Sequence, residues 1–354
     1  MSAVRKPSII KKHVMLKKCL LCLTLTLLLA FTGFAQDNNR IAIGFYNLEN
    51  LFDTIDDPLT NDAEFLPNGA NQWTAERYEK KLANMSKVIS LVAKEYGNCV
   101  AMGVSEVENE RVMLDLVNHP NLKPFNYGVV HHDSPDRRGV DVALIYQKDR
   151  FTVVDVVPYR LYTDDTSFRT RDQLLVKGVI DGIDTVHIIV NHWPSKLGGE
   201  KRSMPKRIAA AELSKHISDS IMQSNPAAKV MIMGDLNDNP DAKSIIEYLG
   251  AKKKAKDTGL NQLFNPMYKL YMDGIWSYVY RDEPNVIDQI IISYGLLNAQ
   301  KGYRYAGVNI FRANFLLTKS GSYEGTPMRT FAAGTYLGGY SDHLPVYIIL
   351  EKIQ

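Results

Sequence analysis

The chain has 354 residues, 45% hydrophobic and 23% charged, which is the balance of an ordinary folded protein. Its formal net charge of +3 is no argument for nucleic-acid binding, because six of the 42 basic residues and none of the 39 acidic ones lie within positions 1–35. The remaining chain has 36 basic against 39 acidic residues and a net charge of −3, and its single cysteine, Cys99, excludes an internal disulfide.

Residues 1–35 have the pattern of a secretory signal peptide. Lysines precede an apolar run over 19–30, and Gly33-Phe34-Ala35 supplies small residues for cleavage. The run is too short to span a bilayer comfortably, and an uncleaved anchor is the alternative. We therefore expect export to the periplasm or beyond, a single domain over 36–354, and no stable membrane insertion after cleavage.

The first part of the mature chain alternates strands and helices. Thr74 is a candidate N-cap, and apolar residues recur behind it at spacings of three and four until Gly97 ends the pattern. We expect, in order, a strand over 41–47, this helix, a buried strand over 100–104 and a short helix over 110–118.

The middle of the chain is strand-rich, with no helical stretch between its apolar runs. Four strands are expected, over 140–147, 151–158, 174–180 and 185–191. "DGID" at 181–184 is typical of a hairpin turn. Consecutive strands without crossover helices predict antiparallel pairing.

Helices and strands alternate again toward the C-terminus. A helix is expected over 205–222, with Ser203 as a possible N-cap and Pro205 in its first turn. The elements expected after it are a strand over 229–235, a short helix over 241–249, a strand over 285–293 and a closing strand from Leu344. This order suggests two packed sheets with helices outside them.

Polar residues gather where the expected strands begin or end. They are Asn47, Glu106, Asn191, His192, Asp235, Asn237, Asp288, Asp342 and His343. Taken singly, Asn47 is more typical of a turn. Glu106 and Asp288 are harder to dismiss, because acids beside buried apolar residues are paired or bind metal. Antiparallel pairing brings the end of one strand and the start of its neighbour to one rim, so we expect a shared site there.

The polar positions lie within a set of motifs that resembles a known family. The motifs are "FYNLENLFD" (45–53), "GVSEVEN" (103–109), "RRGVDVALIY" (137–146), "NHWPSK" (191–196), "GDLND" (234–238), "VIDQIII" (286–292) and "SDHLPV" (341–346). In this order they resemble the endonuclease/exonuclease/phosphatase superfamily, here as a secreted bacterial member. The resemblance implies an α+β fold, a four-layer α/β/β/α sandwich with two packed, largely antiparallel (mixed) β-sheets.

The resemblance also implies a divalent metal and hydrolysis of a phosphate ester by in-line attack of water. It makes Glu106 the main metal ligand, with Asn47 beside it and Asp342 as a further contributor. Oxygen ligands of this kind suit Mg²⁺, with Mn²⁺ or Ca²⁺ as alternatives.

The remaining polar residues take catalytic roles by the same resemblance. Asp235 and Asn237 correspond to residues that contact the nucleophilic water and the phosphate. His343 corresponds to the imidazole at the scissile phosphate, either as base or as charged stabiliser, and Asp288 to the acid that orients it. His192 corresponds to a second histidine that binds phosphate or protonates the leaving group.

Four arginines are candidates for substrate binding. Arg202 and Arg207 lie in a basic loop that is equally well read as solvated surface. Arg329 lies in the segment before the last motif, where it could line the mouth of the site. Arg138 could face the site, and its neighbour Asp141 either faces the site or satisfies a turn.

The leading hypothesis is a secreted, metal-dependent phosphodiesterase, most simply an endonuclease or exonuclease. The alternative is a phosphatase or phosphodiesterase that acts on phospholipids, inositol phosphates or other small phosphate esters. The net charge of −3 weighs mildly against tight binding to long DNA. A non-catalytic binding domain on the same fold is a third possibility. The expected partner is nucleic acid or another phosphate ester, and a monomer is expected.

Overall fold

The computed structural model describes residues 39–353, which carry two six-stranded sheets. The predicted signal peptide therefore lies outside the described residues, and its boundary stays a prediction. The first sheet has the order β13-β16-β1-β2-β4-β3. Its strands are β13 (Gly302–Ile310), β16 (Val346–Ile353), β1 (Arg40–Leu51), β2 (Cys99–Val107), β4 (Asp141–Gln147) and β3 (Tyr127–His131).

The second sheet has the order β5-β6-β7-β8-β12-β9. Its strands are β5 (Phe151–Tyr159), β6 (Gln173–Ile180), β7 (Asp184–His192), β8 (Lys229–Asp235), β12 (Asp288–Ser293) and β9 (Leu263–Phe264). Two short hairpins, β10 (Tyr278–Tyr280) with β11 (Glu283–Asn285) and β14 (Phe331–Ala332) with β15 (Thr335–Tyr336), lie outside the sheets.

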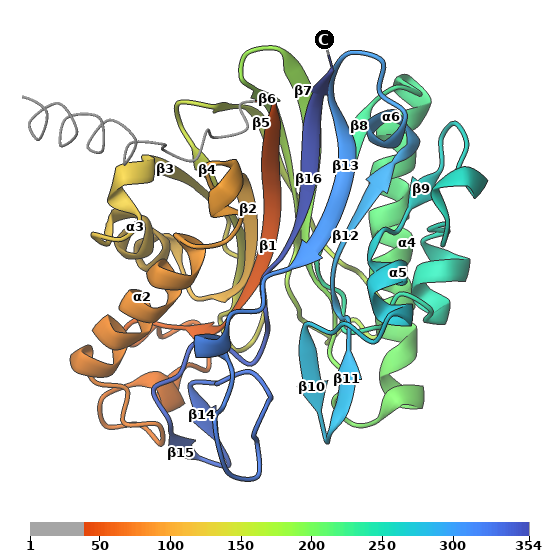
Figure 1. Cartoon of the computed structure of the whole chain (residues 1–354). Helices are drawn as coiled ribbons and strands as arrows, with labels where there is room; N and C mark the ends of the chain where they lie inside the picture. The colour runs from red at the N-terminus through yellow and green to blue at the C-terminus, as the bar shows by residue number, and fades with distance from the viewer. Residues whose placement is uncertain (1–38, 354) are drawn as a thin grey trace, which may run out of the picture. The chain divides into compact units, whose positions relative to one another are not determined.

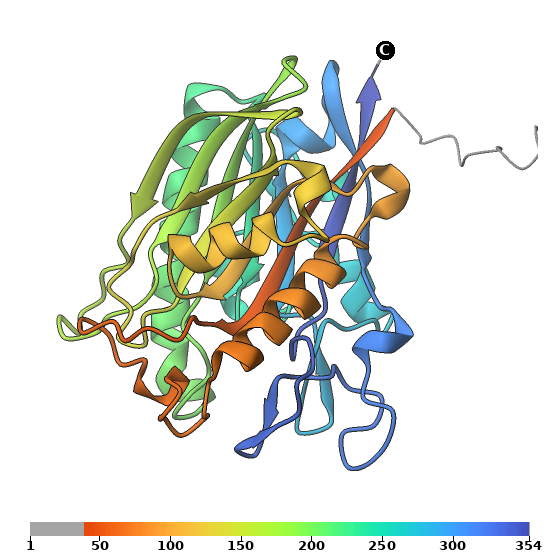
Figure 2. The ribbon, with the colours of Figure 1, turned by 90° about the vertical axis from the view of Figure 1, so that its left-hand side faces the viewer.

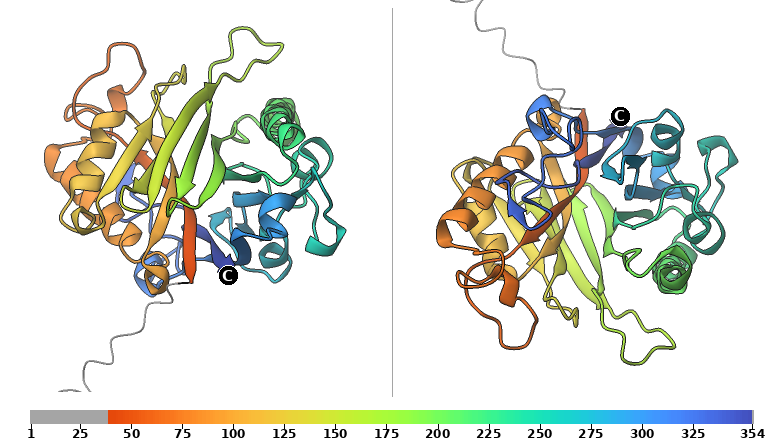
Figure 3. Two further views of the ribbon diagram at one scale, coloured as in Figure 1. Left: turned by 90° about the horizontal axis from the view of Figure 1, so that it is seen from above. Right: turned by 90° about the horizontal axis from the view of Figure 1, so that it is seen from below.

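The sheets stack face to face, and helices cover their outer faces (Figure 1). The helices are α2 (Ala75–Ile89) and α3 (Glu110–Asn118) on the first sheet, and α4 (Glu200–Ser224), α5 (Met267–Met272) and the short α6 (Tyr294–Leu297) beside the second. Figure 2 shows α2 and α3 across the face of the first sheet, and Figure 3 shows the layers edge-on. This is the expected α/β/β/α sandwich of mixed sheets.

The directions of the strands bring the polar residues at their ends to one edge of the sandwich. β1 pairs with β2 in parallel, and β7 pairs with β8 in parallel, so each pair ends on the same side. β12 is antiparallel to β8 and begins where β8 ends, because Asp288 lies opposite Asp235 in the register. Asp288 is thus the first residue of its strand and is fully buried there.

Most expected elements are present, with four differences. α2 ends at Ile89, and Gly97 instead ends a separate 3-10 turn at Lys94–Tyr96. The short helix expected over 241–249 is a single π-helical turn at Ser244–Tyr248. β4 and β5 do not pair: each finds apolar neighbours in a different sheet, so the chain changes sheets at residues 148–150. α4 begins at Glu200, so Ser203 is no N-cap; its hydroxyl donates to the Gly199 carbonyl (2.8 Å), and Pro205 lies beyond the first turn.

Sequence reasoning missed β3 and β13. The side chains of β13 at the edge of the first sheet are mostly half-buried or exposed, so no continuous apolar run marks the strand. Within residues 39–353, no helix is both long enough and apolar enough to cross a bilayer.

Gly234 allows β7 and β8 to approach each other directly before Asp235. A Cβ atom there would lie 2.2 Å from the backbone oxygen of Asn191. We expect Gly234→Ala to lower the free energy of unfolding by roughly 1–3 kcal/mol, measured by urea denaturation, because two backbones must move apart. Gly307→Ala is the matched control, since its nearest contact is a side-chain atom at 3.5 Å. Equal stability of the two variants would contradict this assignment.

Candidate active site

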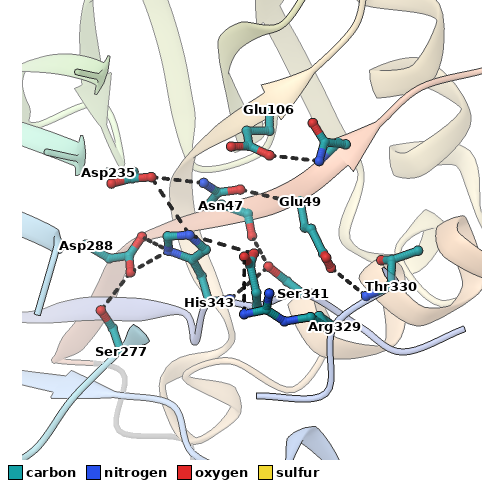
Figure 4. Close-up of polar contacts among 12 residues, drawn as sticks. Asn47, Glu49, Glu106, Asp235, Ser277, Asp288, Arg329, Thr330, Ser341 and His343 are labelled. Carbon is teal, nitrogen blue, oxygen red and sulfur yellow. Dashed lines mark hydrogen bonds and ion pairs between the residues drawn. The ribbon is translucent and has the colours of Figure 1, made fainter. Parts of the chain in front are cut away.

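Six polar side chains from both sheets converge at this edge, and all of them except His192 are labelled in Figure 4. They come from the end of β1 (Asn47), β2 (Glu106), β7 (His192) and β8 (Asp235), from the start of β12 (Asp288) and from the segment before β16 (His343). A cavity of about 760 Å³ opens onto Glu106, His192, Asp235, Asn237, Asp342 and His343. The predicted rim therefore exists, and it faces a space large enough for a substrate.

His343 is held rigidly by Asp288. Its Nδ1 lies 2.9 Å and 3.0 Å from the two carboxylate oxygens, one of which also accepts a 2.6 Å hydrogen bond from the Ser277 hydroxyl. The Tyr278 ring stacks on the imidazole, with 4.6 Å between ring centroids. The backbone N–H of His343 donates to Ser341 Oγ at 3.1 Å. Only Nε2 is left to face the cavity.

The charge of His343 is set by neighbouring acids. Burial acts to lower the pKa of its imidazole, but Asp288 and Asp342 outweigh burial and raise the pKa well above the ordinary value. Nε2 lies 3.7 Å from Asp342 Oδ1 and 3.9 Å from Asp235 Oδ2. The ring is therefore a cation at neutral pH, suited to stabilise negative charge or to donate a proton.

Asp235 faces the same cavity and is oriented by two asparagines. Asn47 Nδ2 donates to Asp235 Oδ2 (3.1 Å), and the backbone N–H of Asn237 donates to Oδ1 (3.0 Å). Burial, together with Asp288 and Glu106, raises the pKa of Asp235 to about 7, although His343 opposes this. A carboxylate with this pKa can accept a proton near neutrality.

Asn237 closes this side of the site. It adopts a left-handed backbone conformation (φ 52°), and its side-chain amide donates to the Trp193 carbonyl at 3.0 Å. These contacts hold the turn after β8 against the end of β7, so Asn237 stays beside Asp235.

A bulge directs Glu106 into the site. The register of β2 against β4 shifts between Ser105 and Val107, and Glu106 has a left-handed backbone (φ 58°). Its Oε2 accepts a 3.0 Å hydrogen bond from the backbone N–H of Asn50, and its Oε1 lies 3.7 Å from His192 Nε2. One carboxylate oxygen is therefore fixed by the backbone and the other faces the cavity.

His192 has the opposite electrostatic surroundings to His343. Burial, followed by the charges of Arg171, Arg138 and His343, lowers its pKa well below the ordinary value, so it is neutral. Its Nε2 is 3.5 Å from Asp235 Oδ2, and its buried Nδ1 has no hydrogen-bond partner within the described part of the chain.

The oxygens at this edge fit a hard divalent cation. Burial is the main cause of the raised pKa of Asp235, and the negative charges of Asp288 and Glu106 add to it, so these three acids lie close enough to act on one another. Asn47 Oδ1 accepts one hydrogen bond, from the Glu49 N–H (2.9 Å), which leaves it a second lone pair. Asp342 is less free, because it faces Arg329 at 3.7 Å as well as His343.

The predicted arginines divide between the site and the scaffold. Arg138 and Arg202 line the cavity, and Arg329 reaches the site through Asp342. The prediction that Arg207 binds substrate is wrong, because its side chain is fully buried and is bound to Asp238 (2.8 Å) and Glu200 (2.6 Å). Burial of its charge is possible only because those two acids compensate it.

Asp141 proves to be a structural acid. It accepts hydrogen bonds from Ser134 and lies 3.1 Å from His131 Nε2. With the exposed Asp133, these side chains form a group that could hold a cation, but none of the three lines the cavity. Arg171, which sequence reasoning missed, binds Asp136 and the carbonyls of His192 and Trp193 and so braces the end of β7.

A buried lysine anchors the segment that leads to the site, and sequence reasoning missed it too. Lys81 on α2 donates to Thr330 Oγ1 (2.7 Å) and to the Tyr340 carbonyl (2.6 Å), and its Nζ lies 3.8 Å from Glu49 Oε2. Glu49 in turn accepts from the Thr330 N–H at 2.6 Å. Lys81 and Glu49 together thus hold Thr330 and Tyr340, the two ends of the segment directly before Ser341.

The fold and this site together define a phosphoester hydrolase: a buried Asp–His pair, acids for a divalent cation and a cavity between them. The model of the endonuclease/exonuclease/phosphatase family matches residues 42–352, and the chain belongs to that family. The family is divalent-metal dependent. A non-catalytic domain is therefore not supported. No match was found among the curated proteins.

Several solved structures share the fold. D. rerio TDP2 in complex with a single-strand DNA product is 12% identical, with a TM-score of 0.53 over 88% of this chain and 98% of that one. The Bacteroides thetaiotaomicron mannosyl-6-phosphatase Bt3783 is 14% identical (TM-score 0.50, 88% and 99%). ANGEL2, a 2′,3′-cyclic phosphatase, is 11% identical (TM-score 0.54, 88% and 95%). At these identities the likeness is one of fold.

Asp288→Asn tests the role of the buried acid. We expect kcat/KM to fall roughly 10²- to 10⁴-fold, as for loss of a positioned acid–base group. Because the lost charge is one that raises the pKa of His343, the high-pH limb of the rate profile should move to lower pH. The exposed Asp257→Asn is the control. An unchanged pH profile in Asp288→Asn would show that this acid does not set the charge of His343.

Lys81→Met tests the anchor. It removes the buried ammonium group that donates to Thr330 and Tyr340, so we expect a loss of roughly 1–3 kcal/mol in unfolding free energy by urea denaturation. Burial and Asp342 raise the pKa of Glu49 to about 7 even beside Lys81, so the loss should be larger at pH 8 than at pH 6, and adding Glu49→Gln should remove that pH dependence. Lys80→Met, on the exposed side of the same helix, should be near neutral. Equal effects of Lys81→Met and Lys80→Met would contradict the assignment.

Proposed function

We propose that this chain is an exported, divalent-metal-dependent phosphodiester hydrolase that acts on nucleic acid. The observation that carries the proposal is a second cavity, of about 770 Å³, next to the first. Both cavities are lined by Asn237, Tyr278 and Ile287, which lie beside the catalytic groups. A phosphate at the centre thus has room for a substituent on each side, which a diester needs and a monoester does not.

Asp235 and His343 divide the chemistry in this proposal. Asp235, with a pKa of about 7, orients the attacking water and accepts its proton. The cationic His343, held by Asp288, stabilises the charge that develops on the phosphoryl oxygens. Neutral His192 can donate a hydrogen bond from Nε2 to phosphate or to the leaving oxygen. Asn237 holds the turn on which Asp235 depends.

A divalent cation completes the site in this proposal. Glu106 and Asn47 would hold it, with Asp342 as a further contributor, and Mg²⁺ suits these oxygens best. When bound, the ion supplies neutralisation of phosphate charge. Mn²⁺ and Ca²⁺ are the alternatives.

A phosphatase or phosphodiesterase for small phosphate esters is the second candidate. The net charge of −3 in residues 36–354 favours it, because binding to long nucleic acid depends mainly on neutralising many phosphates. A relative of the same fold is a mannosyl-6-phosphatase. The leader pattern of residues 1–35 supports export to the periplasm or outside the cell, and we propose that the chain acts as a monomer.

A substrate panel tests the proposal. With Mg²⁺, kcat/KM for bis(p-nitrophenyl) phosphate and a single-stranded oligonucleotide should exceed that for p-nitrophenyl phosphate, and chelation with EDTA should abolish all hydrolysis. Glu106→Gln should act like chelation, with a loss of roughly 10²-fold or more. Faster hydrolysis of monoesters would favour the second candidate, and full activity after chelation would overturn the metal requirement.

A further inference from the structure

The outer part of the first cavity is strongly basic. Six cationic side chains line it: Arg137, Arg138, Arg169, Arg171, Arg202 and Lys206. Beyond the catalytic acids, its lining contains only two carboxylates, Asp136 and Asp165. The wall away from the catalytic centre therefore carries an excess of positive charge, in a chain whose residues 36–354 have a net charge of −3.

Most of these cations already have protein partners. Arg171 is bound to Asp136 at 3.0 Å, and Arg138 lies 3.7 Å from the same acid. Arg137 donates to the Ser167 carbonyl at 2.9 Å, and Arg169 donates to two carbonyls of its own loop. These four side chains shape the loops around the cavity.

Arg202 and Lys206 differ from the other four. They are four residues apart on α4, so they project from the same side of the helix, and both line the cavity. Over residues 39–353, no carboxylate lies within ion-pair distance of either. The nearby Asp165 accepts from the Ser167 N–H (3.0 Å) and hydroxyl (2.6 Å) through Oδ1. Lys206 contributes to the lowered pKa of Asp165, after the hydrogen bonds from Ser167, but from beyond ion-pair distance.

Several cations near Arg202 and Lys206 are paired with acids, although within residues 39–353 the exposed Lys201 is not. Lys196 is paired with Glu200 (3.0 Å), Arg207 with Asp238 (2.8 Å) and Lys215 with Asp219 (2.7 Å). Like charges at this helical spacing repel each other weakly, and an anion bound between Arg202 and Lys206 would remove that repulsion. Lys206 also lies over the Phe168 ring (3.8 Å to its centroid), which holds the ammonium group at the cavity wall.

We propose that Arg202 and Lys206 form a subsite for a second phosphate of the substrate, apart from the phosphate that is cleaved. The proposal rests on the proposed function, because it assumes that a scissile phosphate lies at His343. His343 lines the same cavity as Arg202 and Lys206, so a single substrate can reach the catalytic centre and the subsite. Guanidinium and ammonium groups are the usual partners of phosphate. The second phosphate belongs to a neighbouring nucleotide or to a small bisphosphate ester.

The test compares substrates that differ by one phosphate. We would measure kcat/KM for the thymidine dinucleotide TpT, with and without a phosphate at either end, and for a sugar bisphosphate against its monophosphate. The wild type should prefer one phosphorylated form. Arg202→Gln with Lys206→Gln should reduce that preference roughly 10- to 100-fold, the loss expected from charge-assisted hydrogen bonds. The form that is preferred identifies the source of the second phosphate.

Lys201→Gln is the matched control for Lys206→Gln. Lys201 is an exposed cation in the same helix that lines neither cavity, so the variant makes the same charge change without touching the subsite. Arg202→Lys with wild-type Lys206 should retain most of the preference. No preference in the wild type, or an equal loss in Lys201→Gln, overturns the proposal.

A binding measurement separates this proposal from the proposed function. Calorimetry with the inactive Asp235→Asn protein should show tighter binding of the phosphorylated dinucleotide than of TpT. That difference should shrink as ionic strength rises, and it should be much smaller when Arg202→Gln and Lys206→Gln are added to the inactive protein. Hydrolysis of diesters without this difference overturns the subsite alone. The difference without diester hydrolysis leaves the subsite standing and overturns the nuclease.

Discussion

The hydrogen bond between Asp288 and His343 joins the two sheets, and the geometry of the site depends on it. Asp288 begins β12 in the second sheet, whereas His343 leads into β16 in the first. A fully buried carboxylate is costly unless it is compensated, and here the compensating group comes from the opposite layer. The bond from Asn47 to Asp235 crosses between the sheets in the same way. The packing of the two sheets and the alignment of the catalytic side chains therefore depend on the same hydrogen bonds, so neither can change without the other.

The same edge of the sandwich holds two imidazoles in different protonation states, His343 charged and His192 neutral. Burial lowers the pKa of both rings; at His343 the carboxylates outweigh it, whereas at His192 the charges of Arg171 and Arg138 add to it. One ring can therefore be charged while the other stays neutral. Arg171 thus has two roles, because it braces the end of β7 and adds to the effect of burial on His192.

Local sequence patterns were enough to predict most strands and the polar residues at their ends, because strand periodicity and strand ends are local properties. The pairing partner of a strand is not a local property, and the apolar runs of β4 and β5 do not indicate which sheet each strand joins. Arg207 was misassigned because its buried partner Asp238 lies 31 positions later, and its nearer partner Glu200 is not itself buried and so gives no sign that Arg207 is. Lys81 did leave a signal. It falls on the apolar stripe of α2, three residues after Tyr78 and four before Met85, where a charged residue needs a buried partner.

The place of β16 has a consequence for when the enzyme becomes active. This strand is the last in the sequence, yet it lies between β13 and β1 in the sheet, and His343 precedes it by three residues. Residues 39–340 alone have neither the strand that fixes the imidazole nor the imidazole itself. The site can therefore form only after β16 has paired with both β1 and β13, so docking of this one strand completes the first sheet and the catalytic centre in the same step.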